Sequence, residues 1–148
     1  MLYTPGFIEF LRVLNRRGVR YLIIGGYAVA FHGYPRATKD LDLWLEAGPE
    51  NAGRTLDAIR DFFGETLGLE PEDFLAPGVI QLGYAPNRID LVLLPESGPE
   101  FGTAYERAVE TEVEGVAVRV VSKEDLLALK RTFGRTQDLA DVDALEEE

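Results

Sequence analysis

Residues 25–43 of the chain, GGYAVAFHGYPRATKDLDL, join a glycine turn to a pair of alternating aspartates. The preceding residues 21–24 form a short apolar run that ends at Gly25-Gly26, which is typical of a buried strand. Residues 27–31 then predict a short helix, because a glycine and a proline follow it closely. The stretch therefore predicts a strand, a turn and a helix, followed by a second strand that carries the aspartates.

That second strand covers residues 40–45, in which polar and apolar positions alternate. Alternation places three leucines on one face of the strand and Asp40, Asp42 and Trp44 on the other. Two carboxylates on one face, roughly 7 Å apart at their Cα atoms, repel each other unless a positive charge lies between them. A hard dication such as Mg²⁺ suits such a pair, although the pair taken alone fits a solvated strand face better.

A third carboxylate lies in residues 88–92, another segment with strand alternation. Here Ile89 and Leu91 face one side and Asp90 faces the other. If this strand neighbours residues 40–45, three carboxylates converge, and two-metal phosphoryl transfer needs such a cluster. The glycine turn adds unpaired backbone N–H groups and room for a close approach of phosphate.

The order of the remaining elements indicates the fold class. We expect an α+β domain with one mixed sheet flanked by helices, as a single unit over residues 1–148 with the C-terminal helices of residues 122–146 packed on it. The helices are expected over residues 5–17, 50–63, 100–109, 123–133 and about 136–145, and the further strands over residues 79–84, 88–94, 112–113 and 116–121, paired as two hairpins.

Composition limits the functions that need consideration. The chain has 148 residues and no cysteine, which predicts one domain without disulfides or thiolate metal sites. It has no apolar run long enough for a membrane span and no secretory signal pattern, so a cytoplasmic protein is expected. Net charge is −11, with sixteen acidic and four basic side chains in residues 41–118. This balance disfavours a broad nucleic-acid surface, whereas the basic segment 1–40 leaves room for one small polyanion.

The spacing from Gly25-Gly26 through thirteen residues to Asp40-Leu41-Asp42-Leu43 resembles the signature of the polymerase-beta-like nucleotidyltransferase superfamily. The wider stretch is similar to the minimal nucleotidyltransferases related to AbiEii-type toxins. The similarity continues in Arg88-Ile89-Asp90-Leu91, in residues 122–126 with Lys130, and in Arg135 with Asp138 and Asp141. It implies a nucleotidyltransferase fold over nearly the whole chain.

The resemblance also implies a role for each residue of the motif. Asp40 and Asp42 would ligate two Mg²⁺ ions, and Asp90 would be the third metal ligand and help to activate the attacking hydroxyl. Gly25 and Gly26 would hold the triphosphate of ATP or another NTP. The implied reaction is attack of an acceptor hydroxyl on the α-phosphate, with pyrophosphate leaving.

Further candidates carry alternatives that the sequence leaves open. Arg36, Thr38 and Lys130 are candidate nucleotide-binding residues. Each also has a structural explanation: Arg36 would lie in a solvated loop, Thr38 would begin the strand, and Lys130 would place a favourable charge at a helix C-terminus. Four further residues have either a role in the site or a structural explanation. A solvated loop would explain Lys39, a packing or capping role His32, core packing Trp44, and a helix terminus Arg135.

The leading hypothesis is thus an Mg²⁺-dependent transferase of nucleoside monophosphates. Its acceptor would be a protein hydroxyl, a tRNA end or a small molecule. The resemblance favours a toxin–antitoxin or defence context, with either a partner protein or a tRNA as the target. The acidic balance tilts the choice away from tRNA. The alternative is a nucleotide- or protein-binding module on the same fold without turnover.

Overall fold

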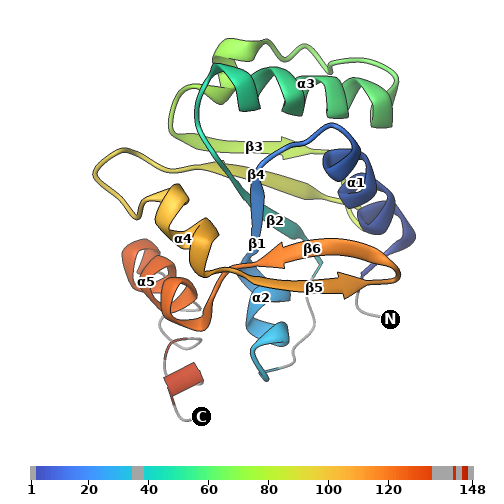
Figure 1. The fold of residues 1–148 in the computed structure, drawn as a ribbon. Coiled ribbons are helices and arrows are strands. Elements are labelled where there is room, and N and C mark those ends of the chain that lie inside the picture. The colour runs from blue at the N-terminus through green and yellow to red at the C-terminus, as the bar shows by residue number, and fades with distance from the viewer. Residues whose placement is uncertain (1–2, 35–38, 135–141, 143–144, 147–148) are drawn as a thin grey trace.

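The computed structural model of the chain describes residues 3–34, 39–134, 142 and 145–146. In these residues one mixed sheet has the strand order β3-β4-β2-β1-β6-β5 and is flanked by helices (Figure 1). The elements are α1 (Pro5–Arg16), β1 (Tyr21–Ile24), α2 (Gly25–Phe31), β2 (Leu41–Leu45), α3 (Pro49–Phe63), the 3₁₀ helix η1 (Pro71–Phe74), β3 (Gly78–Leu82), β4 (Ile89–Leu93), α4 (Phe101–Arg107), β5 (Val109–Val113), β6 (Val116–Val120) and α5 (Lys123–Phe133). The expected α+β class is confirmed.

Strand β1 lies at the centre of the sheet and connects its two halves. It pairs antiparallel with β2 and parallel with β6, while β2 pairs parallel with β4. The outer strands β3 and β5 complete the two expected antiparallel hairpins, with β4 and β6 respectively. Because α3, η1 and β3 intervene between β2 and β4 in the chain, the parallel pairing joins strands that are far apart in sequence.

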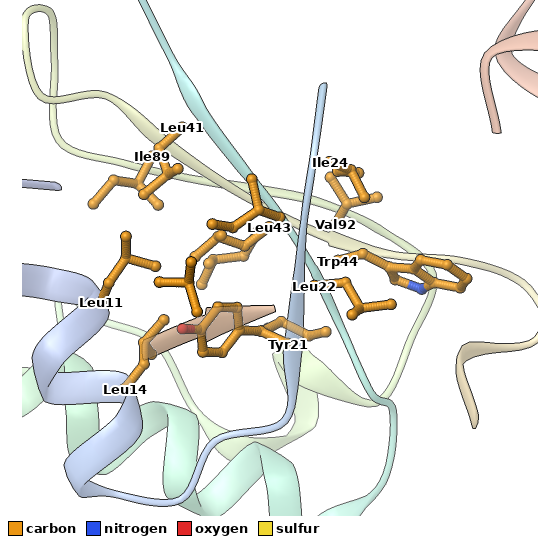
Figure 2. Packing of buried hydrophobic residues seen from close by; sticks show 14 of the residues in the cluster. Leu11, Leu14, Tyr21, Leu22, Ile24, Leu41, Leu43, Trp44, Ile89 and Val92 are labelled. Atoms are coloured by element: carbon orange, nitrogen blue, oxygen red, sulfur yellow. The ribbon is translucent and has the colours of Figure 1, made fainter. Parts of the chain in front are cut away.

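The core has two layers, one on each face of the sheet. Leu43 points toward Leu11 and Leu14 of α1, while Trp44 and Val92 point to the opposite side of the sheet (Figure 2). All five of these side chains are buried. The strand alternation in residues 40–45 thus places Leu41 and Leu43 on the side of α1 (Figure 2) and leaves the aspartate face toward α4 and α5 (Figure 1).

One helix boundary differs from the sequence-based expectation. The helix expected over residues 100–109 ends at Arg107, because Ala108 has extended backbone angles and Val109 begins β5. Strand β5 pairs with β6 along all five of its residues. Cross-strand pairing therefore extends this hairpin beyond the residues 112–113 that local sequence indicated.

Two other segments also differ from, or lie beyond, the expected elements. The sequence did not indicate η1, whose Phe74 is 1% exposed and anchors the connection from α3 to β3. The last expected helix lies mostly outside the described residues; Val142, Leu145 and Glu146 are helical. Among the described residues, no helix combines the length and apolarity that crossing a membrane requires.

Asn51, near the start of α3, ties that helix to the strands. Its Oδ1 accepts from the N–H of Arg20 at 2.8 Å, and its Nδ2 donates to the carbonyls of Arg20 and Glu46 at 3.0 and 2.9 Å. Because Asn51→Ala removes three hydrogen bonds to partly buried backbone groups, we expect it to lower the free energy of unfolding by about 2–3 kcal/mol. Urea denaturation measures the change; Glu50→Ala, at an exposed position, is the control and is expected to change it by less than about 0.5 kcal/mol.

Candidate active site

Asp42 and Asp90 lie side by side because β2 and β4 are parallel neighbours. In this pairing Leu41 lies opposite Ile89, and Asp42 lies opposite Asp90. Neighbouring strands are about 4.8 Å apart, so the two carboxylates leave the same face of the sheet at close range. Asp40 directly precedes β2, and all three aspartates line one pocket with a volume of about 640 Å³.

Gly25 brings the backbone into close contact with Asp42. Strand pairing places Ile24 opposite Asp42, and Gly25 then begins α2 with a φ of +70°, in the left-handed region that favours glycine. A Cβ atom on Gly25 would lie 2.1 Å from Oδ2 of Asp42. Any other residue would therefore displace that carboxylate. Gly26, the next residue of the turn, also lines the pocket.

Arg88 brings a positive charge to the carboxylates. Its Nε and Nη2 donate to the two oxygens of Asp90, both at 3.2 Å, and its Nε lies 3.8 Å from Oδ2 of Asp40. The hydrogen bonds and the charge of Asp90 raise the pKa of Arg88 above its ordinary value, so the guanidinium stays ionised. Sequence reasoning assigned Arg88 no role, although its position two residues before Asp90 predicts the same strand face.

Tyr27 is a second neighbour of the carboxylates that the sequence did not single out. It lies one turn into α2, where its ring packs against Tyr3 with ring centroids 4.3 Å apart. Burial and the nearby charge of Asp40 raise the pKa of the Tyr27 hydroxyl. The phenol is therefore a neutral group next to the cluster at physiological pH.

Helix α5 forms the opposite wall of the pocket. Leu126, Leu129 and Phe133 make this wall mainly apolar, and Val79 continues the apolar lining on the β3 side. Lys130 is the basic residue that α5 contributes to the lining, and only 5% of it is exposed. The pocket thus combines a cluster of carboxylates, a glycine turn and an apolar wall with one ammonium group.

Three candidate residues of the sequence analysis lie outside the described residues. These are Arg36 and Thr38, between α2 and β2, and Arg135, after α5. Lys39, the next residue after this first segment, is described and exposed. The assignment of Arg36 and Thr38 to the nucleotide site stays a prediction.

Trp44 and His32 have structural contacts. Trp44 is 2% exposed and packs edge-to-face on Phe101, with ring centroids 5.4 Å apart, so core packing accounts for it. Nε2 of His32 lies 2.7 Å from the carbonyl oxygen of Val121 and ties the end of α2 to the end of β6. Both residues thus support the fold around the pocket.

The aspartates have the chemistry of a magnesium site, but their oxygens are partly engaged. Hard dications prefer carboxylate oxygens and share them with substrate phosphates, which fits Asp40, Asp42 and Asp90. Within the described part of the chain, however, no three acidic, histidine or cysteine side chains are grouped closely enough to hold one ion. Since Arg88 binds both oxygens of Asp90, a metal ion that uses this carboxylate has to compete with the guanidinium.

Solved structures similar to this chain include nucleotidyltransferases and a nucleotidyltransferase-like protein. An antigenic nucleotidyltransferase-like protein from Paracoccidioides brasiliensis is similar over 93% of this chain and 72% of its own, with a TM-score of 0.54 and 16% identity. The lincosamide antibiotic adenylyltransferase LnuA, bound to lincomycin, is similar over 98% of this chain and 97% of its own, with a TM-score of 0.59 and 15% identity. These likenesses confirm the expected nucleotidyltransferase fold.

A third similar structure is ANT(2″)-Ia in complex with adenylyl-2″-tobramycin. The similarity covers 93% of this chain and 83% of that one, with a TM-score of 0.55 and 16% identity. No family model matches the sequence, and no curated protein matches it. At this level of identity the likeness establishes the fold, whereas activity has to be inferred from the site.

Proposed function

We propose that the chain is a nucleotidyltransferase that moves a nucleoside monophosphate from a nucleoside triphosphate to a hydroxyl acceptor. The observation that carries the proposal is the pairing of Asp42 with Asp90 on neighbouring parallel strands, in a pocket that Asp40 and the glycine turn also line. Three carboxylates in one pocket repel each other and so lower stability, which means that a purely structural role does not account for the cluster. A phosphoryl-transfer site requires such a cluster.

Asp40, Asp42 and Asp90 are the residues that would hold divalent metal. Bound there, Mg²⁺ would supply positive charge to the oxygens of the triphosphate during in-line displacement. The resemblance to the polymerase-beta-like superfamily and the nucleotidyltransferase fold both support this assignment. The three carboxylates are chemically suitable ligands for Mg²⁺. A metal ion at Asp90 would compete with Arg88 for this carboxylate.

The chain's own groups account for positioning and proton transfer. Gly25 and Gly26 line the pocket and would hold the triphosphate at the turn, and Lys130 supplies a buried ammonium on another wall. The acceptor oxygen bonds to the α-phosphorus, the bond from that phosphorus to the bridging oxygen breaks, and pyrophosphate leaves. The hydroxyl proton passes to the carboxylate of Asp90.

For the acceptor, we favour a small molecule or a protein over a tRNA end. The net charge of −11 opposes a large polyanion. One structural neighbour, LnuA, is an antibiotic adenylyltransferase, and another, ANT(2″)-Ia, is bound to adenylyl-2″-tobramycin. A small hydroxylated molecule is therefore a reasonable first substrate class. A partner protein in a toxin–antitoxin pair is the second class, on the resemblance to AbiEii-type proteins.

A non-catalytic nucleotide- or protein-binding module is the alternative function. The observation that favours it is the bidentate contact of Arg88 with Asp90, which neutralises a carboxylate that a metal needs. A module of this kind keeps the ion pair permanently. It would bind a nucleotide without releasing pyrophosphate.

Thermal melting with each nucleoside triphosphate and Mg²⁺ tests the proposal. At a ligand concentration of about 100 Kd, binding stabilises the native state by about 2.7 kcal/mol, and we expect one triphosphate to raise Tm accordingly. The double variant Asp40→Ala/Asp42→Ala is expected to lose the shift. Asp57→Ala/Asp61→Ala removes two carboxylates from exposed ion pairs on α3 and is expected to keep it.

Transfer of labelled nucleotide then separates the enzyme from the binding module. Pyrophosphate release with a hydroxylated acceptor supports the transferase, whereas stabilisation without release with any acceptor class supports the module. Absence of a shift with every triphosphate would contradict both.

A further inference from the structure

The guanidinium of Arg88 lies where the carboxylates need a cation. It donates two hydrogen bonds to Asp90 and is within 3.8 Å of Asp40. The side chain of Asp90 is 12% exposed, whereas that of Arg88 is 40% exposed. The carboxylate is therefore held in place by the protein, while the guanidinium reaches solvent and is free to swing outward without opening the core.

The charge balance explains why a cation belongs at this position. Asp42 and Asp90 lie opposite each other, and Asp40 lines the same pocket. Three carboxylates in one pocket repel each other unless a positive charge lies near them. Arginine stays charged under all physiological conditions. Arg88 thus supplies the positive charge that offsets this repulsion when neither metal nor nucleotide is present.

We infer that Arg88 is a built-in counter-ion that competes with divalent metal for Asp90 and leaves it when metal and triphosphate bind together. This inference rests on the proposed function. A divalent ion that arrives alone competes with the guanidinium for the carboxylate of Asp90, and displacing Arg88 leaves the guanidinium without this partner. A triphosphate that arrives with the ion offers the released guanidinium new phosphate oxygens, which it binds well.

Two measurable consequences follow from this competition. First, the protein alone binds a divalent ion weakly, and removal of Arg88 tightens that binding. Second, metal and triphosphate each increase the affinity for the other, and this coupling is reciprocal. Because part of the coupling passes through Arg88, it decreases when the guanidinium is removed.

The chain offers a closely matched control in Arg107. This arginine makes the same bidentate contact with Asp125, with distances of 3.2 and 2.5 Å. Its side chain is 46% exposed and that of Asp125 is 10% exposed, close to the values of the Arg88–Asp90 pair. Neither residue lines the pocket of the aspartates. Arg107→Met thus removes an equivalent ion pair at a different place.

The experiment is a Mn²⁺ titration followed by electron paramagnetic resonance, with and without a non-hydrolysable ATP analogue. Without nucleotide, we expect Arg88→Met to bind Mn²⁺ about five-fold more tightly than wild type, the scale of a partly exposed ion pair. Arg107→Met is expected to match wild type. The gain in Mn²⁺ affinity that the nucleotide brings is expected to be smaller in Arg88→Met than in wild type.

The outcomes separate this inference from the proposed function. If wild type and Arg88→Met bind no Mn²⁺ even with nucleotide, both the inference and the proposed function are wrong. If wild type binds Mn²⁺ with nucleotide and Arg88→Met shows unchanged or weaker affinity without it, only the inference is overturned. Arg88→Gln removes the charge, retains hydrogen-bond donors and replaces Arg88→Met in the titration if the latter does not fold.

Discussion

Asp42→Asn is expected to reduce nucleotidyl transfer by about 10³-fold, a loss of about 4 kcal/mol of transition-state stabilisation. Asparagine has nearly the same shape as aspartate, so the pairing of β2 with β4 and the packing around Gly25 stay intact. What the substitution removes is the negative charge at the position directly beside Asp90. Steady-state transfer of labelled nucleotide measures the loss.

The same variant is expected to fold at least as well as wild type in the absence of metal. One of the adjacent carboxylates becomes neutral, so its repulsion with Asp90 disappears. A fall in activity without a fall in Tm therefore separates a chemical role from a structural one. Asp57→Asn, on the exposed side of α3, is the control and is expected to retain activity. Near-normal transfer by Asp42→Asn would rule out a metal-ligand role for this residue.

Much of the fold was predictable because the chain has clear local periodicity. The alternation in residues 40–45 predicted that the leucines share one face of the strand, and Leu41 and Leu43 both lie buried on the α1 side (Figure 2). The hairpins formed by β3–β4 and β5–β6 were also predictable, since each is local. The residue at which β5 begins was not predictable, because only pairing with β6 makes residues 109–111 part of the strand.

The site was predictable residue by residue only in part. The presence of Asp40, Asp42 and Asp90 on strand faces follows from the two-residue period. Their arrangement depends on the parallel pairing of β2 with β4. That pairing joins segments separated by α3 and a strand, and no local pattern encodes it. Their roles as metal ligands stay predictions.

Arg88 and Lys130 show two different limits of sequence reasoning. The strand period already placed Arg88 on the face of Asp90, and attention to acidic residues alone left it without a role. For Lys130, the sequence predicted a charge near the end of a helix, but its 5% exposure arises from the way α5 packs over the sheet. Tertiary packing of this kind is set by the whole core rather than by neighbouring residues.

Gly25→Ala is the substitution expected to damage both the fold and the site. The residue has a φ of +70°, which costs an L-residue about 1–2 kcal/mol. The new Cβ would lie 2.1 Å from Oδ2 and 2.9 Å from Cγ of Asp42. Overpacking of this kind costs about 1–3 kcal/mol, so we expect the free energy of unfolding to fall by about 2–5 kcal/mol in total.

Activity is expected to fall further than stability alone explains. The carboxylate of Asp42 has to move to admit the methyl group, and a shift of about 1 Å at a reacting centre costs about 10²-fold in rate. Gly53→Ala, in α3, is the matched control, because a Cβ atom on Gly53 would meet nothing within 4 Å. It is expected to be neutral or slightly stabilising. Urea denaturation and labelled-nucleotide transfer measure the two effects.

A double-mutant cycle identifies the contact responsible. In an Asp42→Ala background the two shortest contacts are absent, so Gly25→Ala is expected to destabilise mainly through its backbone angle. The cost of Gly25→Ala should therefore be smaller by about 1–3 kcal/mol in that background than in wild type. Strict additivity would mean that the glycine is required by the turn alone. Non-additivity of the expected sign would show that Gly25 is required because Asp42 lies against it.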